Sequence, residues 1–125
     1  MSVTIEDPQG GITRYLEDVT EGAVTATLFE MDGRLRSLTP VDTGFARNSW
    51  LVTMSENDEG QPGANPPGGA ALQYKLEKVA YINNGANYIE FLDNGSSQQA
   101  PGGMTDLVIP EVPRIIEAEV KRRAE

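Results

Sequence analysis

The sequence contains no cysteine and no histidine. Disulfide bonds, thiolate and imidazole chemistry and most zinc ligation are therefore excluded, and so is the usual general base of neutral pH. No apolar run approaches the roughly 20 residues that a membrane-spanning helix requires, so we expect a soluble protein with no membrane partner. Met1 leads into polar SVTIEDPQGG, which has neither a basic end nor an apolar core. We therefore expect no signal peptide and synthesis in the cytosol.

Basic residues are scarce: ten Lys and Arg stand against nineteen Asp and Glu, which gives a net charge of -9. A surface of this sign repels a phosphate backbone and argues against tight nucleic-acid binding. It suits a protein past which DNA slides, or one that imitates the charge of DNA, and solubility alone also explains it. A chain of 125 residues predicts a single domain, 1–125.

Two helices are predicted towards the ends of the chain. Residues 12–38 hold no proline, and their apolar residues recur at helical spacing in two rows. The rows are Ile12, Leu16, Val19, Ala23 and Ala26, and Val24, Leu28, Met31, Leu35 and Leu38. A helix of about 40 Å must lie across something wide, which we expect to be a sheet. The second helix is expected to begin at Pro110 and to carry Val112, Ile115, Ile116 and Val120 inward. Residues 1–11 are expected to form an N-terminal arm.

Two strands are predicted between these helices. SWLVTMSE alternates, with Trp50, Val52 and Met54 on the buried face, and Trp50 is expected in the core. AALQYKLEKVA predicts a short helix with Leu72 and Leu76 four residues apart. The strand-like VAYIN that follows is expected to pair with the first strand. The fold class predicted is α+β, with both long helices packed on a small antiparallel sheet.

Residues 56–69, ENDEGQPGANPPGG, have four glycines, three prolines and no large apolar side chain. Such a segment does not collapse onto a core by itself, and a structureless loop of this length tends to be functional or disordered. We expect a flexible loop that becomes ordered against a neighbouring subunit. Its candidate contact residues are Gln61, Asn65 and Pro66.

The stretch 83–104 is dense in residues with special backbone behaviour. Asn87 and Glu90 resemble a capping box, which predicts a short helix carrying Tyr88, Phe91 and Leu92 into the core. Gly95 is expected to end that helix in a left-handed conformation. A hairpin through Asn83-Asn84-Gly85 is the alternative.

The segment SSQQAPGGM that follows offers uncharged hydrogen-bonding side chains, which suit a subunit contact better than acid or base catalysis. An ordinary connecting loop would explain it equally well. Its candidate contact residues are Ser97, Gln98, Gln99, Ala100, Pro101 and Met104. Upstream, Asp42, Thr43 and Gly44 predict a turn that leads through a short helical turn to Trp50.

Three segments together, TPVDTGFARNSW (39–50), YINNGANYIEFLDNG (81–95) and SSQQAPGGM (96–104), resemble the neck family of long-tailed bacteriophages. These are tail-completion or head-to-tail joining proteins similar to the minor tail protein Z of lambda. Their order and spacing agree with the family pattern over about nine-tenths of the chain. The chain departs from that pattern at Phe45, where leucine is usual, at Ile89 (alanine), at Asp93 (glutamate) and by an extra glutamine at 98 or 99. The subfamily therefore stays open.

The resemblance implies a structural virion protein that forms a ring in the phage neck, located in the virion and made in the cytoplasm of the bacterial host. Its implied partners are copies of itself, the portal or connector proteins on the head side and the tail terminator or tail tube protein on the other. A hexamer matching the tail is expected, and a twelvefold ring matching the portal stays open. DNA would pass through the lumen without sequence-specific binding, and no cofactor or metal is implied.

Two other classes of function remain. A small acidic inhibitor that imitates DNA would explain the charge, but acids and bases are mixed in both helices. Catalysis is not expected, because Asp32, Asp42, Asp93 and Asp106 lie beside glycine or threonine, as aspartates of turns and caps do. No base or nucleophile accompanies them, so we do not expect an enzyme.

Overall fold

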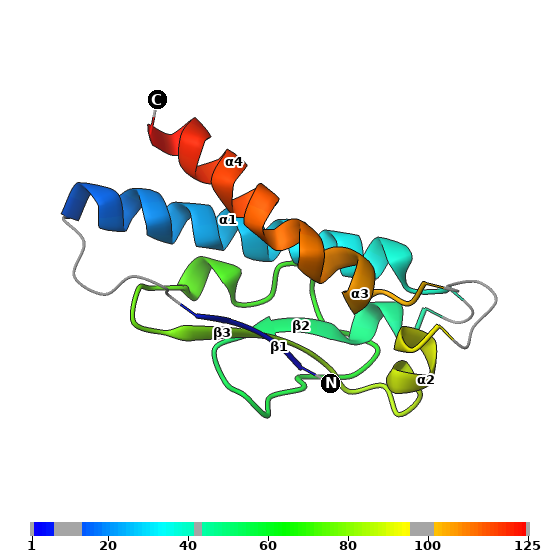
Figure 1. The fold of residues 1–125 in the computed structure, drawn as a ribbon. Coiled ribbons are helices and arrows are strands. Elements are labelled where there is room, and N and C mark those ends of the chain that lie inside the picture. Colours follow the sequence, from blue (N-terminus) through cyan, green and yellow to red (C-terminus); the bar gives the residue numbers. More distant parts are fainter. Residues whose placement is uncertain (1, 7–13, 42–43, 96–101, 125) are drawn as a thin grey trace.

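A computed structural model describes residues 2–6, 14–41, 44–95 and 102–124. The elements in chain order are β1 (Ser2–Glu6), α1 (Arg14–Leu38), the 3-10 turn η1 (Arg47–Ser49), β2 (Trp50–Thr53), the 3-10 turn η2 (Ala71–Gln73), β3 (Val79–Asn84), α2 (Ile89–Asp93), α3 (Thr105–Val108), the 3-10 turn η3 (Ile109–Glu111) and α4 (Val112–Ala124). Helices α1 and α4 form a layer over one face of a small antiparallel sheet (Figure 1). The α+β fold predicted from the sequence is confirmed.

The sheet has three strands in the order β1-β3-β2, with β3 in the middle. The predicted pairing of the two inner strands is confirmed, since Trp50 lies opposite Asn84 and Thr53 opposite Tyr81. The third strand, β1, lies within the residues that were expected to form an arm. It pairs antiparallel with β3 over residues 2–6. Its β-branched run VTI was a strand signal, but three residues are too few to decide it.

Helix α1 buries most of the second of its two predicted apolar rows in the core. Val24, Leu28, Met31 and Leu35 are all buried there, in one core cluster with Trp50, Val52, Ile82 and Met104. The helix ends before Pro40, where the Thr39 amide donates to the carbonyls of Leu35 and Arg36. Residues 12 and 13 of the predicted helix lie outside the described residues.

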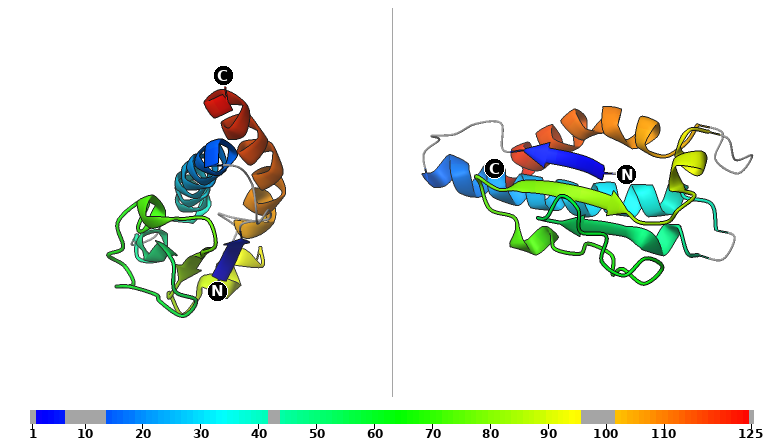
Figure 2. Two further views of the ribbon diagram at one scale, coloured as in Figure 1. Left: turned by 90° about the vertical axis from the view of Figure 1, so that its left-hand side faces the viewer. Right: turned by 90° about the horizontal axis from the view of Figure 1, so that it is seen from below.

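The C-terminal helical segment begins earlier than predicted, at Thr105 rather than at Pro110. Pro110 falls inside the 3-10 turn that joins α3 to α4. The earlier start has a polar cause, because the Asp93 carboxylate accepts from the amides of Met104 and Thr105 and from the Thr105 hydroxyl. Helix α4 then packs along α1 (Figure 2), and of its predicted inward residues Ile115 is buried while the other three are half-buried.

The short helix predicted in AALQYKLEKVA is only the single turn η2. The chain becomes extended at Tyr74, whose side chain enters the core. Leu72 is left 79% exposed and Leu76 is half-buried, so the predicted pairing of these two leucines is wrong. The extended backbone at Tyr74 ends the helical turn and places the tyrosine side chain in the core.

Helix α2 forms where the helix, rather than the hairpin, was predicted, and Gly95 ends it at φ +83° as expected. The predicted capping box is wrong. The helix begins at Ile89, one residue later than the box requires, and Tyr88 precedes it with no side-chain cap. The inward face is rotated accordingly. Ile89 and Leu92 are buried, whereas Tyr88 and Phe91, expected in the core, are 40% and 57% exposed.

Candidate interaction surfaces

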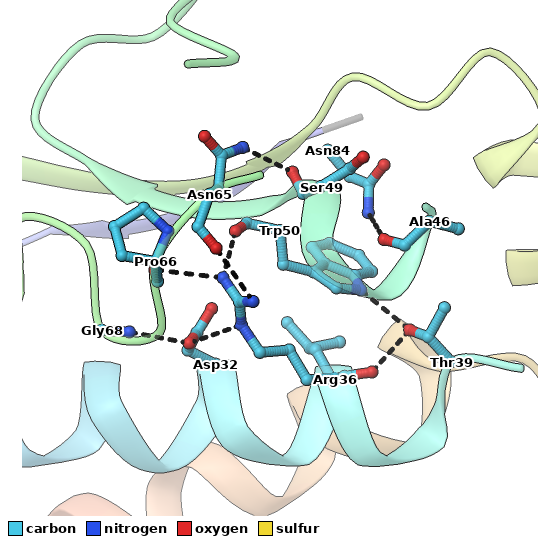
Figure 3. Close-up of polar contacts among 11 residues, drawn as sticks. Asp32, Arg36, Thr39, Ala46, Ser49, Trp50, Asn65, Pro66, Gly68 and Asn84 are labelled. Atoms are coloured by element: carbon cyan, nitrogen blue, oxygen red, sulfur yellow. Dashed lines mark hydrogen bonds and ion pairs between the residues drawn. The ribbon is translucent and has the colours of Figure 1, made fainter. Parts of the chain in front are cut away.

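The glycine- and proline-rich segment 56–69 is held against its own domain rather than extended towards a neighbour (Figure 3). The Asn65 amide nitrogen donates to the carbonyls of Ser49 (3.1 Å) and Glu59 (3.0 Å). Its oxygen accepts from the Gln61 amide at 2.8 Å. Asn65 is therefore buried, and its prediction as a subunit contact is wrong. Gln61 and Pro66 lie exposed on the same segment.

This segment also changes the burial of β2, for which one buried face was predicted. All four residues of the strand are buried, because the segment covers the outer face of the sheet. The Thr53 hydroxyl donates to the Asp58 carboxylate, and Gly60 lies against the Leu51 side chain. Asn83, on β3, donates to the carbonyls of Glu56 and Asp58 at 3.0 and 2.7 Å. A segment without large apolar residues of its own is thus fixed by hydrogen bonds and by contacts of its glycines with side chains of the domain.

A buried ion pair on α1 anchors the same segment (Figure 3). Arg36 Nε donates to Asp32 Oδ2 at 2.9 Å, and the Gly68 amide donates to the same oxygen at 2.9 Å. The remaining guanidinium nitrogens donate to the backbone carbonyls of Trp50, Asn65 and Pro66. One arginine therefore ties α1 to β2 and to the loop, and we call Asp32, Arg36, Asn65 and Gly68 the polar lock.

Burial in the polar lock makes the charged form of the Asp32 carboxyl less favourable. Burial raises its pKa, and the Gly68 amide and the Arg36 charge offset that rise only in part. Its second oxygen, Oδ1, is buried and has no hydrogen-bond partner among the described residues. Because the carboxyl lies beneath the loop, we assign it a structural role.

The three segments that carry the family resemblance are joined to one another by hydrogen bonds. Trp50 Nε1 donates to the Thr39 hydroxyl at 2.8 Å, within the first segment. The Asn84 amide donates to the Ala46 carbonyl at 2.9 Å and links the second segment to the first. Asp93 links the second segment to the third, because its carboxylate accepts from the Met104 amide at 3.2 Å. Trp50 is buried as predicted. These motif residues build one corner of the fold.

The predicted contact residues of the third segment have separate outcomes. Ser97, Gln98, Gln99, Ala100 and Pro101 lie outside the described residues, and so do Asp42 and Thr43 of the predicted turn. Met104 is fully buried in the core, so its prediction as a contact is wrong. Gly44 has φ +81°, in agreement with a turn.

An open groove lies between the outer face of α1 and α3, with a volume of about 410 Å³. Its wall on α1 is formed by Phe29, Gly33, Ser37 and Leu38, and its wall on α3 by Leu107 and Val108. Phe29, Leu38 and Leu107 are exposed, and Leu107 is the most exposed of the three at 50%. Exposed apolar side chains gathered around a hollow are typical of a protein interaction site. We call these six residues the α1–α3 groove.

A row of charges borders the α1–α3 groove. Arg34 Nε lies 2.9 Å from Glu30 Oε1, and Arg34 Nη1 lies 3.1 Å from Glu111 Oε2, which Arg114 also binds. The hydrogen bond from Arg114 lowers the pKa of Glu111, and the bond to Glu30 raises that of Arg34. Two acidic and two basic side chains thus balance one another here, in a protein that is otherwise strongly acidic.

A second apolar surface lies on α2 and the turn before η1. The Phe45 and Tyr88 rings have their centroids 6.4 Å apart, and both side chains are 40% exposed. Phe91 on α2 is the most exposed of the three. We call Phe45, Tyr88 and Phe91 the aromatic patch. The patch and the α1–α3 groove are built from different elements.

Sequence reasoning missed both surfaces. Phe29 and Gly33 fall outside the two apolar rows of α1, which was a sign that they face elsewhere. Leu107 was placed in no element, because the helix was started at Pro110. Phe91 was assigned to the core through a helix start that was one residue too early.

Comparisons of the chain with protein-family models, with curated proteins and with solved structures found no match. In the part of the chain that the structure describes, no helix is long and apolar enough to cross a membrane. The same residues contain no group of three or more acidic, histidine or cysteine side chains placed to hold a metal ion.

Proposed function

We propose that this chain is a structural subunit of a ring in the neck of a long-tailed bacteriophage, where it joins the DNA-filled head to the tail. The observation that carries the proposal is the joining of the three motif segments. They resemble the neck family in order and spacing. In this fold Asn84 of the second segment donates to the Ala46 carbonyl of the first, and Asp93 of the second accepts from the Met104 amide of the third. Because these segments are joined in the fold, the resemblance covers one connected part of the molecule.

Assembly into a ring needs two different complementary surfaces on each subunit, since head-to-tail contacts pair unlike patches. The α1–α3 groove and the aromatic patch are two different exposed apolar surfaces available for such contacts. In this reading the portal or connector proteins lie on one side of the ring and the tail terminator or tube on the other. The expected symmetry is sixfold, to match the tail.

The net charge of -9 supports the passage of DNA through the lumen. Acidic side chains along a channel repel the phosphate backbone, so that DNA moves without adhering. This part of the proposal is tested by the residues that line the channel of the assembled ring, and a basic lining would contradict it.

The DNA-mimic inhibitor is the less well-supported alternative. Such a protein should present unpaired carboxylates in rows spaced like phosphates. On α4, however, Glu117 pairs with Lys121, and Glu119 with Arg122 and Arg123. The acidic groups of this helix are neutralised locally rather than displayed.

The proposal is tested by immunogold electron microscopy of intact particles of the tailed phage that encodes the chain. Antibody label at the head-to-tail junction is the expected result. Label absent from every particle would overturn the neck role and favour the DNA mimic. An antibody against a known capsid protein of the same particles serves as the positive control for labelling.

A further inference from the structure

We infer that Asn94 is a site of spontaneous deamidation in the folded protein, and that the fold protects Asn84 from the same reaction. Asparagine is followed by glycine at these two positions of the sequence, Asn84-Gly85 and Asn94-Gly95. The inference goes beyond the proposed function and does not depend on it. It rests on the different surroundings that the fold gives to the two asparagines.

The reaction joins the side chain of an asparagine to the backbone of the next residue. The backbone nitrogen of Gly95 attacks Cγ of Asn94, and the side-chain nitrogen leaves as ammonia with the proton of the Gly95 amide. One water molecule then opens the five-membered succinimide at either carbonyl, which gives aspartate or isoaspartate. Glycine favours the attack, because it has no Cβ to hinder the approach of its nitrogen.

The fold holds the Asn84 side chain away from this reaction (Figure 3). Its Nδ2 donates to the Ala46 carbonyl at 2.9 Å, and its Oδ1 accepts from the Ala86 amide at 2.9 Å. Asn84 is 1% exposed and lies at the end of the central strand β3, opposite Trp50. Attack by the Gly85 nitrogen therefore requires both side-chain bonds to break and the buried strand end to open.

Asn94 lies at the end of a short surface helix instead. It is exposed and directly follows the last residue of α2, with φ −82° and ψ 5°. The Gly95 amide donates to the Leu92 carbonyl at 3.2 Å, and this bond must open before the nitrogen can turn towards Asn94 Cγ. Helix α2 has five residues, and so short a helix opens at its end far more readily than the centre of a sheet does.

The identity of the following residue separates Asn94 from the other exposed asparagines. Asn48, Asn57 and Asn87 are exposed as well, but they precede serine, aspartate and tyrosine. The side chains of these residues hinder the attack of the backbone nitrogen. Asn94 thus combines exposure with a following glycine.

The modification falls at the joint between α2 and α3. Asn94 is the neighbour of Asp93, whose carboxylate accepts from the amides of Met104 and Thr105. Both products add one negative charge beside that carboxylate, and isoaspartate also lengthens the main chain by one methylene group. Modified and unmodified chains therefore differ next to the contact that holds the start of α3.

Peptide mapping of the purified full-length protein tests the inference. The protein is incubated in mildly alkaline buffer, folded or in guanidinium chloride, and is then digested with a protease that cleaves after glutamate. Cleavage after Glu77, Glu90 and Glu111 places Asn84 and Asn94 on separate peptides, and mass spectrometry with fragmentation measures the conversion of each.

In the folded protein we expect Asn94 to convert at least about tenfold faster than Asn84, because a buried group reacts only through rare opening. In guanidinium chloride the two rates should be similar, since glycine follows both asparagines. Equal rates at the two positions in the folded protein, or no conversion of Asn94 there, would overturn the inference.

Asn94→Gln is the control variant. It keeps the side-chain amide, but the longer side chain would have to form a larger ring, which closes much more slowly. The peptide from 91 to 111 contains no other asparagine, so its mass gain should disappear in this variant. A mass gain that persists would place the modification at another residue and would also overturn the inference.

Discussion

Asp32 and Gly33 are neighbours on α1, yet they belong to opposite kinds of surface. Asp32 points towards the sheet and is buried in the polar lock, where Arg36 and Gly68 bind it. Gly33 points away, into the α1–α3 groove, and has no described contact there beyond its own helix. At this point of the helix the inner side is committed to its own domain and the outer side is left open.

This difference separates stability from interaction within one helix. Substitutions on the inner side should change the free energy of unfolding strongly, because they leave buried charges or carbonyls without partners. Substitutions on the outer side should leave the monomer stable and change assembly. The four predictions below test whether the two sides are in fact independent.

The largest effect is expected for Arg36→Met. The variant should lose about 3–5 kcal/mol in the free energy of unfolding, because Asp32 remains buried without its counterion. Urea denaturation followed by Trp50 fluorescence measures the loss. Arg34→Met on the groove border is the matched control and should unfold nearly as the wild type does, since its ion pairs are exposed. Similar losses for both variants would contradict the comparison.

Asn65→Ala is expected to have the next largest effect, a loss of about 1–3 kcal/mol, because buried backbone groups lose their partners. Hydrogen exchange should also become faster throughout residues 56–69, while α1 stays protected. Asn57→Ala, which changes an exposed asparagine of the same segment, is the control. Unchanged exchange in the loop would show that Asn65 does not hold it.

Gly33→Ala should stabilise the monomer by about 0.5–1 kcal/mol, because alanine favours the helix and the space is open. Gly22→Ala should gain less, since its new methyl group would displace the Arg123 side chain. Thermal unfolding of the two variants under one condition gives the comparison. A greater gain at Gly22 would mean that the groove face is not free of internal constraint.

The smallest effect is expected in pH dependence, because Arg36 and Gly68 offset part of the burial of Asp32. A raised pKa means that the folded chain keeps this proton at pH values where the unfolded chain has lost it. Stability from this group therefore falls as the pH rises from the ordinary value of 3.8 through the folded pKa. The stability of the wild type minus that of Asp32→Asn should decrease across this window in urea denaturation. An increase would show that the ion pair outweighs burial.

The sequence predicted those parts of the fold that depend on local pattern. The apolar row from Val24 to Leu35, the pairing of β2 with β3 and the left-handed Gly95 all follow from periodicity or from the conformational freedom of glycine. Trp50 was placed correctly in the core for the same reason.

The features that the sequence did not reveal depend on contacts between distant residues. The loop 56–69 was judged flexible from composition, but Arg36, some thirty residues earlier, and Asn83, some twenty-five later, hold it by hydrogen bonds. The start of α3 depends on Asp93, which no local pattern connects to Thr105. The two interaction surfaces appear only once these distant contacts fix which side chains stay outside.

The placement of β1 at the edge of the sheet has a consequence for folding. Residues 2–6 pair with residues 79–83, at the other end of a long stretch of chain that includes all of α1. Closing so large a loop is slow compared with forming a helix, whose contacts are local. During synthesis α1 can form early, whereas β1 stays without its partner strand until β3 has left the ribosome. We expect the sheet to be completed last, with its N-terminal edge closing the fold.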